Sequence, residues 1–416
     1  MLLNRIWIGF FLIAIITGLS KLIFWHDVDV FKNMVSVGLF ESAKTAFELS
    51  IYMTGAICMC LGFMRVGELG GAIRLLSKAI SPLFAKLFPE VPKDHPAVGA
   101  IMMNFSANML GLDNAATPMG LKAMKELQEL NPQKDTASNA QIMFLALNTA
   151  GMTIIPISVL SLLSINKSAD PTEIFVPVLI TTFCSALAAI ILVAVKQRIN
   201  LFNRAVLLYL GSAVTFLLLL LACLYRYPGQ TQNIANIGGN VIILGIFVLF
   251  IGLAIRKRVN VYEEFVEGAK EGFQVAISII PFVVTMLVGI GIFKSSGALD
   301  AVLDGIRWFF IQVGIMHTEF VDALPVGIMK PFSGGTARTL LIQVINDHGV
   351  NDFRSKIAAT MQGGTETTFY VLAVYFGSVN IKKTRYAAGV GLLVDIIGVI
   401  IAILVSYLFY EVPPIR

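Results

Sequence analysis

The chain has 416 residues, of which 56% are hydrophobic and only 14% are charged, and its mean hydropathy is +0.80. A soluble protein carries about a quarter charged residues, so this composition excludes a soluble enzyme and indicates an integral membrane protein. The net charge of +5 comes from basic residues in short loops, which is the pattern of membrane topology rather than of nucleic-acid binding.

Nine apolar runs approach the length of roughly twenty residues that a helix needs to cross a bilayer. The first, residues 6–24, is longer than a usual signal-peptide core and lacks a clear cleavage site, so we expect a retained span. The other eight runs are residues 46–64, 140–164, 174–195, 205–224, 241–255, 272–293, 357–378 and 388–408. The runs are continuous rather than alternating, so we predict an all-α membrane protein with nine to ten full spans.

Four stretches between these runs are less regular. Residues 71–87 and 297–313 are amphipathic or short, whereas residues 97–121 and 323–345 are apolar but interrupted by Pro, Gly, Asn and Ser. Non-helical backbone at membrane depth is tolerated where it lines a cavity. The last two stretches are therefore predicted to be broken or re-entrant helices.

Basic clusters near the span ends predict the orientation. The strongest are residues 196–204, 256–258 and 382–385. Short loops rich in Lys and Arg stay on the cytoplasmic side, so all three clusters are expected there.

The chain also contains an internal repeat. Similar segments recur in the same order in both halves. Residues 41–47 match 267–273 at a separation of 226 residues (267 − 41), and residues 71–72 match 297–298 at the same separation. Residues 105–106 then match 332–333 at a separation larger by one residue, and residues 148–153 match 362–367 at a separation of 214 residues. The predicted topology starts the first copy outside and the second inside, which makes them inverted repeats. This architecture is typical of secondary transporters.

The first candidate site joins the two broken segments. At a helix break, free N–H groups attract anions and free carbonyl groups attract cations. The candidate ligand-binding residues are Asn104, Ser106, Asn108, Asp113, Asn114 and Thr117 in the first copy, and Lys330, Ser333, Gly334, Gly335, Thr336 and Arg338 in the second. The alternative is a pair of tight turns whose polar groups satisfy one another, but two matched breaks favour a binding site.

The second candidate site centres on Glu366, because an ionisable residue at membrane depth is a functional-site hypothesis by default. Its neighbours in the repeat are Asn148, Thr149 and Thr153 in the first copy and Gln362, Thr365 and Thr367 in the second. Glu366 is expected to take up a coupling ion, to bind the substrate, or to pair with Lys330 or Arg338. The alternative is a purely structural ion pair. Asp395, in the middle of the last span, is a weaker candidate.

Enzyme signatures are absent from the sequence. There is no G-x-x-x-x-G-K-[ST] phosphate loop and no H-E-x-x-H pattern. We therefore expect no enzymatic activity, no cofactor and no metal site, and a gradient of H⁺, Na⁺ or the substrate itself would have to drive any transport.

Three stretches resemble a known family. Residues 92–118, with Met-Met-Asn-Phe-Ser-Ala-Asn-Met-Leu-Gly-Leu-Asp-Asn-Ala-Ala-Thr-Pro at their end, look like spore maturation protein A. Residues 330–338, Lys-Pro-Phe-Ser-Gly-Gly-Thr-Ala-Arg, and 364–377, Gly-Thr-Glu-Thr-Thr-Phe-Tyr-Val-Leu-Ala-Val-Tyr-Phe-Gly, look like spore maturation protein B. The chain resembles a fusion of the two, with residues 1–200 as the half similar to spore maturation protein A and residues 201–416 as the half similar to spore maturation protein B. Both proteins belong to the nucleoside-recognition, or gate, domain group.

This resemblance implies a multi-pass protein of the bacterial inner membrane and suggests transport, but it does not give the substrate. Lys330 or Arg338 would suit a small polar or anionic solute, nucleoside-like molecules included, and Glu366 would suit H⁺ or Na⁺ as the coupling ion. The resemblance also hints at a homo-oligomer, and no nucleic-acid partner is expected. Two alternatives remain open at this point: a non-transporting membrane scaffold for envelope or spore maturation, and a translocator of lipid-linked molecules.

Overall fold

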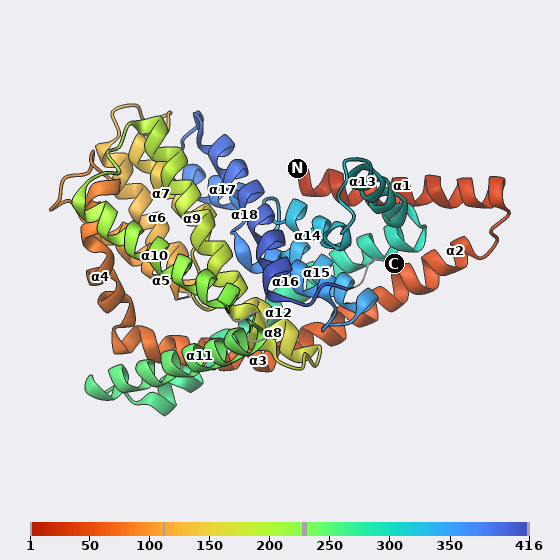
Figure 1. The fold of residues 1–416 in the computed structure, drawn as a ribbon, viewed down its shortest axis with the longest axis horizontal. Coiled ribbons are helices and arrows are strands. Elements are labelled where there is room, and N and C mark those ends of the chain that lie inside the picture. The colour runs from red at the N-terminus through yellow and green to blue at the C-terminus, as the bar shows by residue number, and fades with distance from the viewer. Residues whose placement is uncertain (1, 111–112, 227–230, 414–416) are drawn as a thin grey trace.

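The computed structural model describes residues 2–110, 113–226 and 231–413, and this part of the chain is helical without a β-strand (Figure 1). The helices of the first half are α1 (Leu2–Trp25), α2 (Val30–Asn33), a π-helix (Met34–Glu41), α3 (Ser42–Gly70), α4 (Ala72–Leu87), α5 (Pro96–Met109), α6 (Asp113–Leu130), α7 (Asn139–Ala150), α8 (Ile157–Ile165), a 3-10 helix (Pro171–Ile174) and α9 (Phe175–Gln197). Those of the second half are α10 (Arg204–Arg226), α11 (Thr231–Arg256), α12 (Val261–Ser295), α13 (Ala298–Gln312), a 3-10 helix (Glu319–Ala323), α14 (Leu324–Met329), α15 (Gly334–His348), α16 (Phe353–Gly364), α17 (Thr368–Ser378) and α18 (Ala387–Phe409).

Three helical segments in the described part are long and apolar enough to cross a membrane: Trp7–Trp25, Pro171–Gln197 and Ala387–Phe409. The number rises to five if two bent helix pairs, α3 with α4 and α12 with α13, each count as one span. The chain is therefore a helical membrane protein, whereas the larger number of spans expected from the sequence stays a prediction.

The two bent pairs occupy equivalent places in the repeat. The helix axis turns by 66° between α3 and α4 and by 71° between α12 and α13. Gly71 and Gly297 stand at the bends with φ of +94° and +83°, a left-handed conformation that glycine adopts without a steric penalty. Farther along, Ser138 caps α7 and Asp352 caps α16, at the later separation of 214 (352 − 138). The order of the elements thus follows the repeat predicted from the sequence.

Two of the expected continuous spans are each divided into two short helices. Residues 140–164 form α7 and α8, separated by a break that starts at Gly151 in a left-handed conformation and ends at Pro156. Residues 357–378 form α16 and α17, separated by extended backbone at Thr365 and Thr367. The prediction of unbroken spans was wrong here, because residues of low helix preference, Gly, Thr and Pro, interrupt both apolar runs.

The two predicted broken segments fold as helical hairpins, α5 with α6 and α14 with α15. One detail of the predicted pairing was wrong: Ser106 lies inside α5, whereas Ser333 caps α15 after the turn. The physical reason is Pro331, which cannot continue α14, while α5 contains no proline after its first position.

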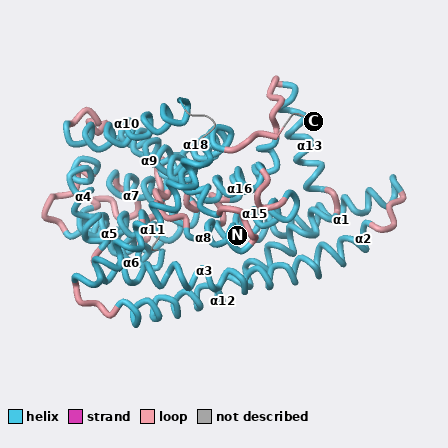
Figure 2. The backbone as a smooth tube through the Cα atoms, turned by 60° about the horizontal axis from the view of Figure 1, so that its bottom comes forward, coloured by secondary structure: helices cyan, strands magenta, loops and turns pink. Residues whose placement is uncertain are grey.

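The leading helices of the two copies, α3 and α12, lie side by side along their length (Figure 2). Arg65 near the end of α3 pairs with Glu264 at 2.9 Å near the start of α12. At the other end, Ser42 at the start of α3 lies against Gly291 near the end of α12. The two helices are therefore antiparallel.

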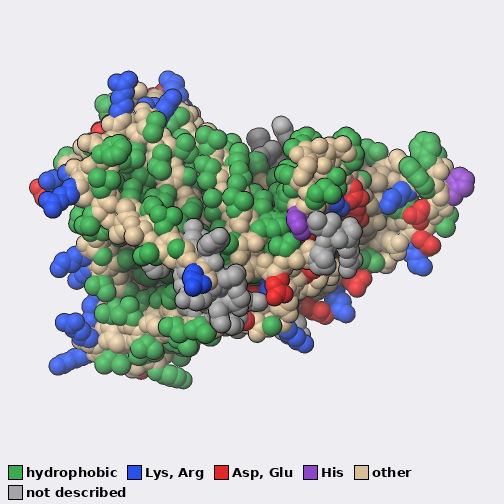
Figure 3. All heavy atoms as spheres, in the orientation of Figure 1, with side chains coloured by type: hydrophobic (Ala, Val, Ile, Leu, Met, Phe, Trp, Pro, Cys, Tyr) green, Lys and Arg blue, Asp and Glu red, His purple; other side chains and the backbone are tan. Residues whose placement is uncertain are grey.

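Two of the predicted basic clusters meet at one end of the molecule. The side-chain amide of Gln197 donates to the Tyr386 hydroxyl at 2.9 Å, and Lys383 pairs with Asp135 at 3.2 Å. The Thr136 hydroxyl, and then Lys383, hold the pKa of the Asp135 carboxyl below its ordinary value. On the visible face, Lys and Arg gather along the left edge (Figure 3). The assignment of this end to the cytoplasmic side stays a prediction.

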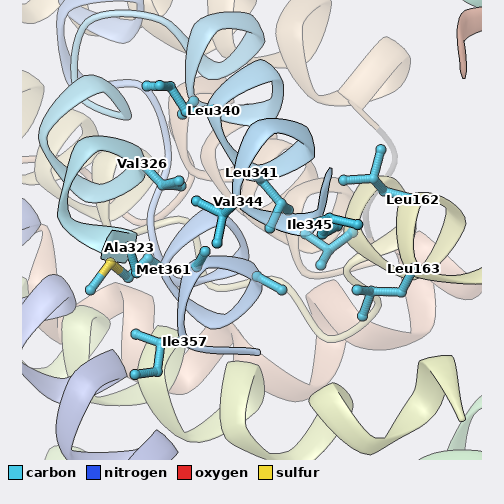
Figure 4. Packing of buried hydrophobic residues seen from close by; sticks show 14 of the residues in the cluster. Leu162, Leu163, Ala323, Val326, Leu340, Leu341, Val344, Ile345, Ile357 and Met361 are labelled. Atoms are coloured by element: carbon cyan, nitrogen blue, oxygen red, sulfur yellow. The ribbon is translucent and has the colours of Figure 1, made fainter. Parts of the chain in front are cut away.

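A core of buried aliphatic residues joins the two halves and includes residues of the second hairpin (Figure 4). Leu162 and Leu163 of α8 pack in the same cluster as Leu341 and Ile345 of α15 and Ile357 of α16. Because this core takes residues from both copies of the repeat, it fixes the position of one copy against the other.

Candidate functional site

The breaks in the two divided helices touch each other. The backbone N–H of Glu366, in the break between α16 and α17, donates to the carbonyl oxygen of Thr149 at the end of α7, at 3.0 Å. Gly151 follows, with φ of +58°, and a Cβ atom placed there would lie 2.7 Å from Cγ of Glu366. Equivalent segments far apart in the sequence are thus in direct contact.

A polar cavity of about 390 Å³ opens beside this contact. Its lining comes from both hairpins and both divided helices, that is, from all four segments that the sequence singled out. The lining residues are Asn108, Thr117, Asn148, Ser158, Lys330, Gly334, Gly335, Arg338, Gln362, Glu366, Thr367, Tyr370, Val371, Val374 and Tyr375. This volume falls within the range of about 300–1,000 Å³ that is usual for small-molecule sites.

The first copy contributes a pair of amides. Nδ2 of Asn108 in α5 donates to Oδ1 of Asn148 in α7 at 2.9 Å, and Nδ2 of Asn148 donates to the carbonyl oxygen of Phe144 at 2.8 Å. The Tyr375 hydroxyl of α17 also donates to Oδ1 of Asn148, at 3.5 Å. These bonds fix the orientation of both amides at the cavity wall.

Gln362 is the corresponding amide of the second copy. Its side chain is 3% exposed, and Nε2 donates to the carbonyl oxygen of Gly334 at 3.4 Å. Oε1 has no hydrogen-bond partner among residues 2–110, 113–226 and 231–413. A buried polar atom without a partner is costly, and one at a cavity wall can accept from a water molecule or from a ligand that supplies the missing donor.

Three charged side chains line the polar cavity. Lys330 is buried at the turn of the second hairpin, while Arg338 in α15 and Glu366 are half-buried. The lining therefore carries two cationic groups and one carboxylate, a combination suited to an anionic or zwitterionic ligand.

A larger apolar cavity of about 920 Å³ adjoins the polar one. It is lined by Trp7, Pro281, Val283, Thr285, Met286, Phe332, Ser333, Gly334, Gly335, Thr336, Arg338, Thr367 and Tyr370. Ser333 and Thr336, predicted for the binding site, therefore face this apolar cavity. Trp7 of α1 is fixed there by its indole N–H, which donates to the carbonyl oxygen of Thr285 at 2.9 Å.

Several predicted residues line neither cavity. Asn104 is fully buried, and its Nδ2 donates to the Ala116 carbonyl oxygen at 2.8 Å, which ties α5 to α6. The Ser106 hydroxyl lies 2.9 Å from that of Ser77 in α4. The side chains of Asp113 and Asn114 lie outside the described residues. In the first hairpin, therefore, Asn108 and Thr117 face the cavity, whereas Asn104 and Ser106 hold helices together.

The threonines beside the breaks have a similar packing role. Thr149 is fully buried near Gly391 of α18, and Thr365 lies against Gly398 of the same helix. The Thr153 hydroxyl donates to the nearby Gly151 carbonyl oxygen at 3.1 Å. These side chains shape the breaks that carry Asn148 and Glu366.

Asp395 is buried in α18, behind the second break. The Thr368 hydroxyl donates to Oδ2 of Asp395 at 2.6 Å, and the Asp395 carboxyl is within electrostatic range of Lys330 and Glu366. Asp395 lines neither cavity, so its visible role is to hold the first residue of α17.

We expect the substitution Thr368→Val to lower the free energy of unfolding by roughly 1–3 kcal/mol, because it removes the hydrogen bond that Thr368 donates to the buried Asp395 carboxyl at nearly unchanged volume. The midpoint of thermal unfolding in detergent measures the change. Thr54→Val is the matched control, since the Thr54 hydroxyl donates back to the Ser50 carbonyl oxygen within α3 and its loss should cost little. Equal midpoints for the two variants would contradict this role of Thr368.

Sequence reasoning missed five of the lining residues: Ser158, Tyr370, Val371, Val374 and Tyr375. Four of them follow Thr367 in α17 at intervals of three, four, seven and eight residues, which is the spacing of one helical face. That spacing would have identified them once the start of α17 was known.

A cluster of possible metal ligands lies outside both cavities. His95, Glu126 and Glu129 place ligand atoms within 4.8 Å of one another. His95 also caps α5, because its Nδ1 accepts from the backbone N–H of Ala97 at 3.2 Å. These three side chains need no ion to be explained, and no metal role follows from them.

The sequence has identifiable relatives. The family model described as "Gate: Nucleoside recognition" matches residues 50–166 and 276–382, together more than half of the chain, and the two matches begin 226 residues apart (276 − 50). Spore maturation protein B of Bacillus subtilis (strain 168) is 45% identical over 154 residues, which are 37% of this chain and 84% of that protein. Spore maturation protein A of the same organism is 39% identical over 158 residues, 38% of this chain and 81% of that protein. Similarity to both is what a fusion of the two would give.

Proposed function

Since this chain belongs to the Gate family of nucleoside-recognition membrane proteins and is homologous to both spore maturation proteins, we propose that it is a secondary transporter for a small polar or anionic solute. The solute would bind in the polar cavity between the two hairpins. One observation carries this proposal: four separate segments, two from each copy of the repeat, converge on one cavity with an amide from each copy at its wall.

The two copies would be inverted repeats that alternately expose the cavity to the two sides of the membrane. The antiparallel packing of α3 and α12 supports this, because the same two helices would be parallel if the copies had the same orientation. The contact between the breaks at Thr149 and Glu366 supports a site at the repeat interface.

The proposed location, number of spans and role of Glu366 follow from this transport model. We place the protein in the bacterial inner membrane with nine to ten spans, as a transporter without enzymatic activity, and we assign Glu366 to the coupling ion, H⁺ or Na⁺. A scaffold would not need a cavity lined with charged groups between its halves, which favours transport over that alternative.

A thermal-shift screen of the purified full chain against polar metabolites, repeated with Na⁺ and at several pH values, tests the proposal. A ligand present at about 100 times its dissociation constant stabilises the folded state by about 2.7 kcal/mol. We expect a subset of anionic or nucleoside-like compounds to raise the unfolding midpoint of the wild type but not that of Gln362→Ala. If no compound acts through Gln362, the proposed binding site is wrong.

A further inference from the structure

The polar and the apolar cavity lie next to each other and share part of their lining. Five residues line both of them: Gly334, Gly335, Arg338, Thr367 and Tyr370. A Cβ atom on Gly335 would meet nothing closer than 3.9 Å, whereas one on Gly334 would lie 2.9 Å from Oγ1 of Thr367. Two chemically different cavities therefore meet at these five residues.

The apolar end is too large and too apolar to serve a small polar solute. Its volume is about 920 Å³, against about 390 Å³ for the polar end, and Val283, Met286 and Phe332 contribute to its wall. Water makes few hydrogen bonds against such walls, and an empty apolar space loses the dispersion contacts that its lining would otherwise make. Its complementary occupant is a hydrocarbon chain.

The charged and polar residues of the polar cavity suit the head group of such a molecule. Arg338 stands where the chambers meet, Lys330 lies deeper in the polar chamber, and Oε1 of Gln362 has no partner among the described residues. Cationic groups beside a free acceptor suit an anionic head that also donates a hydrogen bond.

We propose that the ligand of this site is an amphiphile, an anionic head with one apolar chain, whose head occupies the polar chamber and whose chain lies along Trp7 of α1. This inference rests on the proposed transport function and narrows its substrate class. Trp7 is held in the wall of the apolar chamber by its bond to the Thr285 carbonyl oxygen. The chain of the ligand would therefore contact the indole ring.

The fluorescence of Trp7 can report binding of the apolar chain. The protein has three tryptophans, and Trp25 and Trp308 are 72% and 64% exposed, so the double variant Trp25→Phe/Trp308→Phe leaves Trp7 as the single fluorophore. In phosphatidylcholine nanodiscs, the full-length protein is titrated with an ω-brominated dodecyl phosphate, whose bromine quenches tryptophan on contact. The brominated dodecanol of the same length reports partitioning of the chain alone, and inorganic phosphate is the competitor that represents the head alone.

We expect saturable quenching of Trp7 by the brominated phosphate, competition by unlabelled dodecyl phosphate, and only non-saturable quenching by the alcohol. Arg338→Gln should raise the half-saturating concentration at least tenfold, Arg338→Lys should restore most of the affinity, and Arg74→Gln on the exposed face of α4 should leave it unchanged.

Three results would overturn the inference. They are equal saturation by the alcohol, full competition by inorganic phosphate, and affinity that does not change in Arg338→Gln. Full competition by inorganic phosphate would contradict the amphiphile but not transport, and the transported solute would then be smaller. The same conclusion would follow if the thermal-shift screen identified a soluble ligand and the amphiphile did not quench Trp7. Saturable, Arg338-dependent binding without movement of the amphiphile across a vesicle membrane would instead keep the inference and contradict transport.

Discussion

Glu366→Gln is expected to abolish ion-driven accumulation of the solute in proteoliposomes while leaving the protein folded and able to bind. The substitution preserves the shape of the side chain but removes the charge that we assign to the coupling ion. The backbone bond from Glu366 to Thr149 does not involve the side chain, so the contact between the breaks remains. Uptake of the ligand identified by thermal shift, with and without an imposed H⁺ or Na⁺ gradient, measures the effect.

The control for this variant is Glu263→Gln, which neutralises an exposed carboxylate in the first turn of α12. Glu263 lies far along this helix from Pro281–Met286, the part of α12 that lines the apolar cavity. The control variant should transport like the wild type. Wild-type rate and wild-type ion dependence in Glu366→Gln would remove Glu366 from the mechanism.

Gly151→Ala is the second substitution with a large expected effect. A left-handed conformation costs a residue with a Cβ atom about 1–2 kcal/mol, and the added Cβ would lie 2.7 Å from Cγ and 2.9 Å from the backbone nitrogen of Glu366. We therefore expect a loss of at least about 2 kcal/mol of stability, because overpacking adds to the backbone strain. Ligand binding should fall as well, since Glu366 would be displaced from the cavity wall.

Gly211→Ala tests whether any such loss is specific. Gly211 lies inside α10, and a Cβ atom added there would have no heavy atom within 4 Å outside its own helix backbone and chain neighbours, so alanine should be neutral or should stabilise the helix by about 0.5–1 kcal/mol. Thermal unfolding in detergent compares the two variants. If Gly151→Ala matches Gly211→Ala, then the breaks of the two copies do not pack as described.

The sequence was most informative where polar residues interrupt apolar runs. Amides and carboxylates are costly at membrane depth, which marked Asn108, Gln362 and Glu366 as candidates. The internal repeat separately linked the segments that contain them. The bends at Gly71 and Gly297 were likewise marked by matching segments.

Two kinds of feature were beyond the sequence. The first is the face of α5 that each polar residue occupies. Asn108 lines the cavity, whereas Ser106, two residues earlier and on another face of the helix, contacts α4. The apolar cavity was invisible because Val283 and Met286 look the same whether they face lipid, core or a ligand. The contribution of Trp7 depends on how α1 packs against α12, which no local pattern specifies.

The central claim is that one cavity, built jointly by both copies, binds the transported molecule. It is tested most directly by uptake of the identified ligand into proteoliposomes containing Asn108→Ala, from the first copy, or Gln362→Ala, from the second, with Gln274→Ala on the exposed side of α12 as the control. We predict that each cavity variant lowers uptake at least tenfold, equivalent to about 1.4 kcal/mol, while the control transports like the wild type. Wild-type uptake by either cavity variant would show that the two copies do not share one binding site.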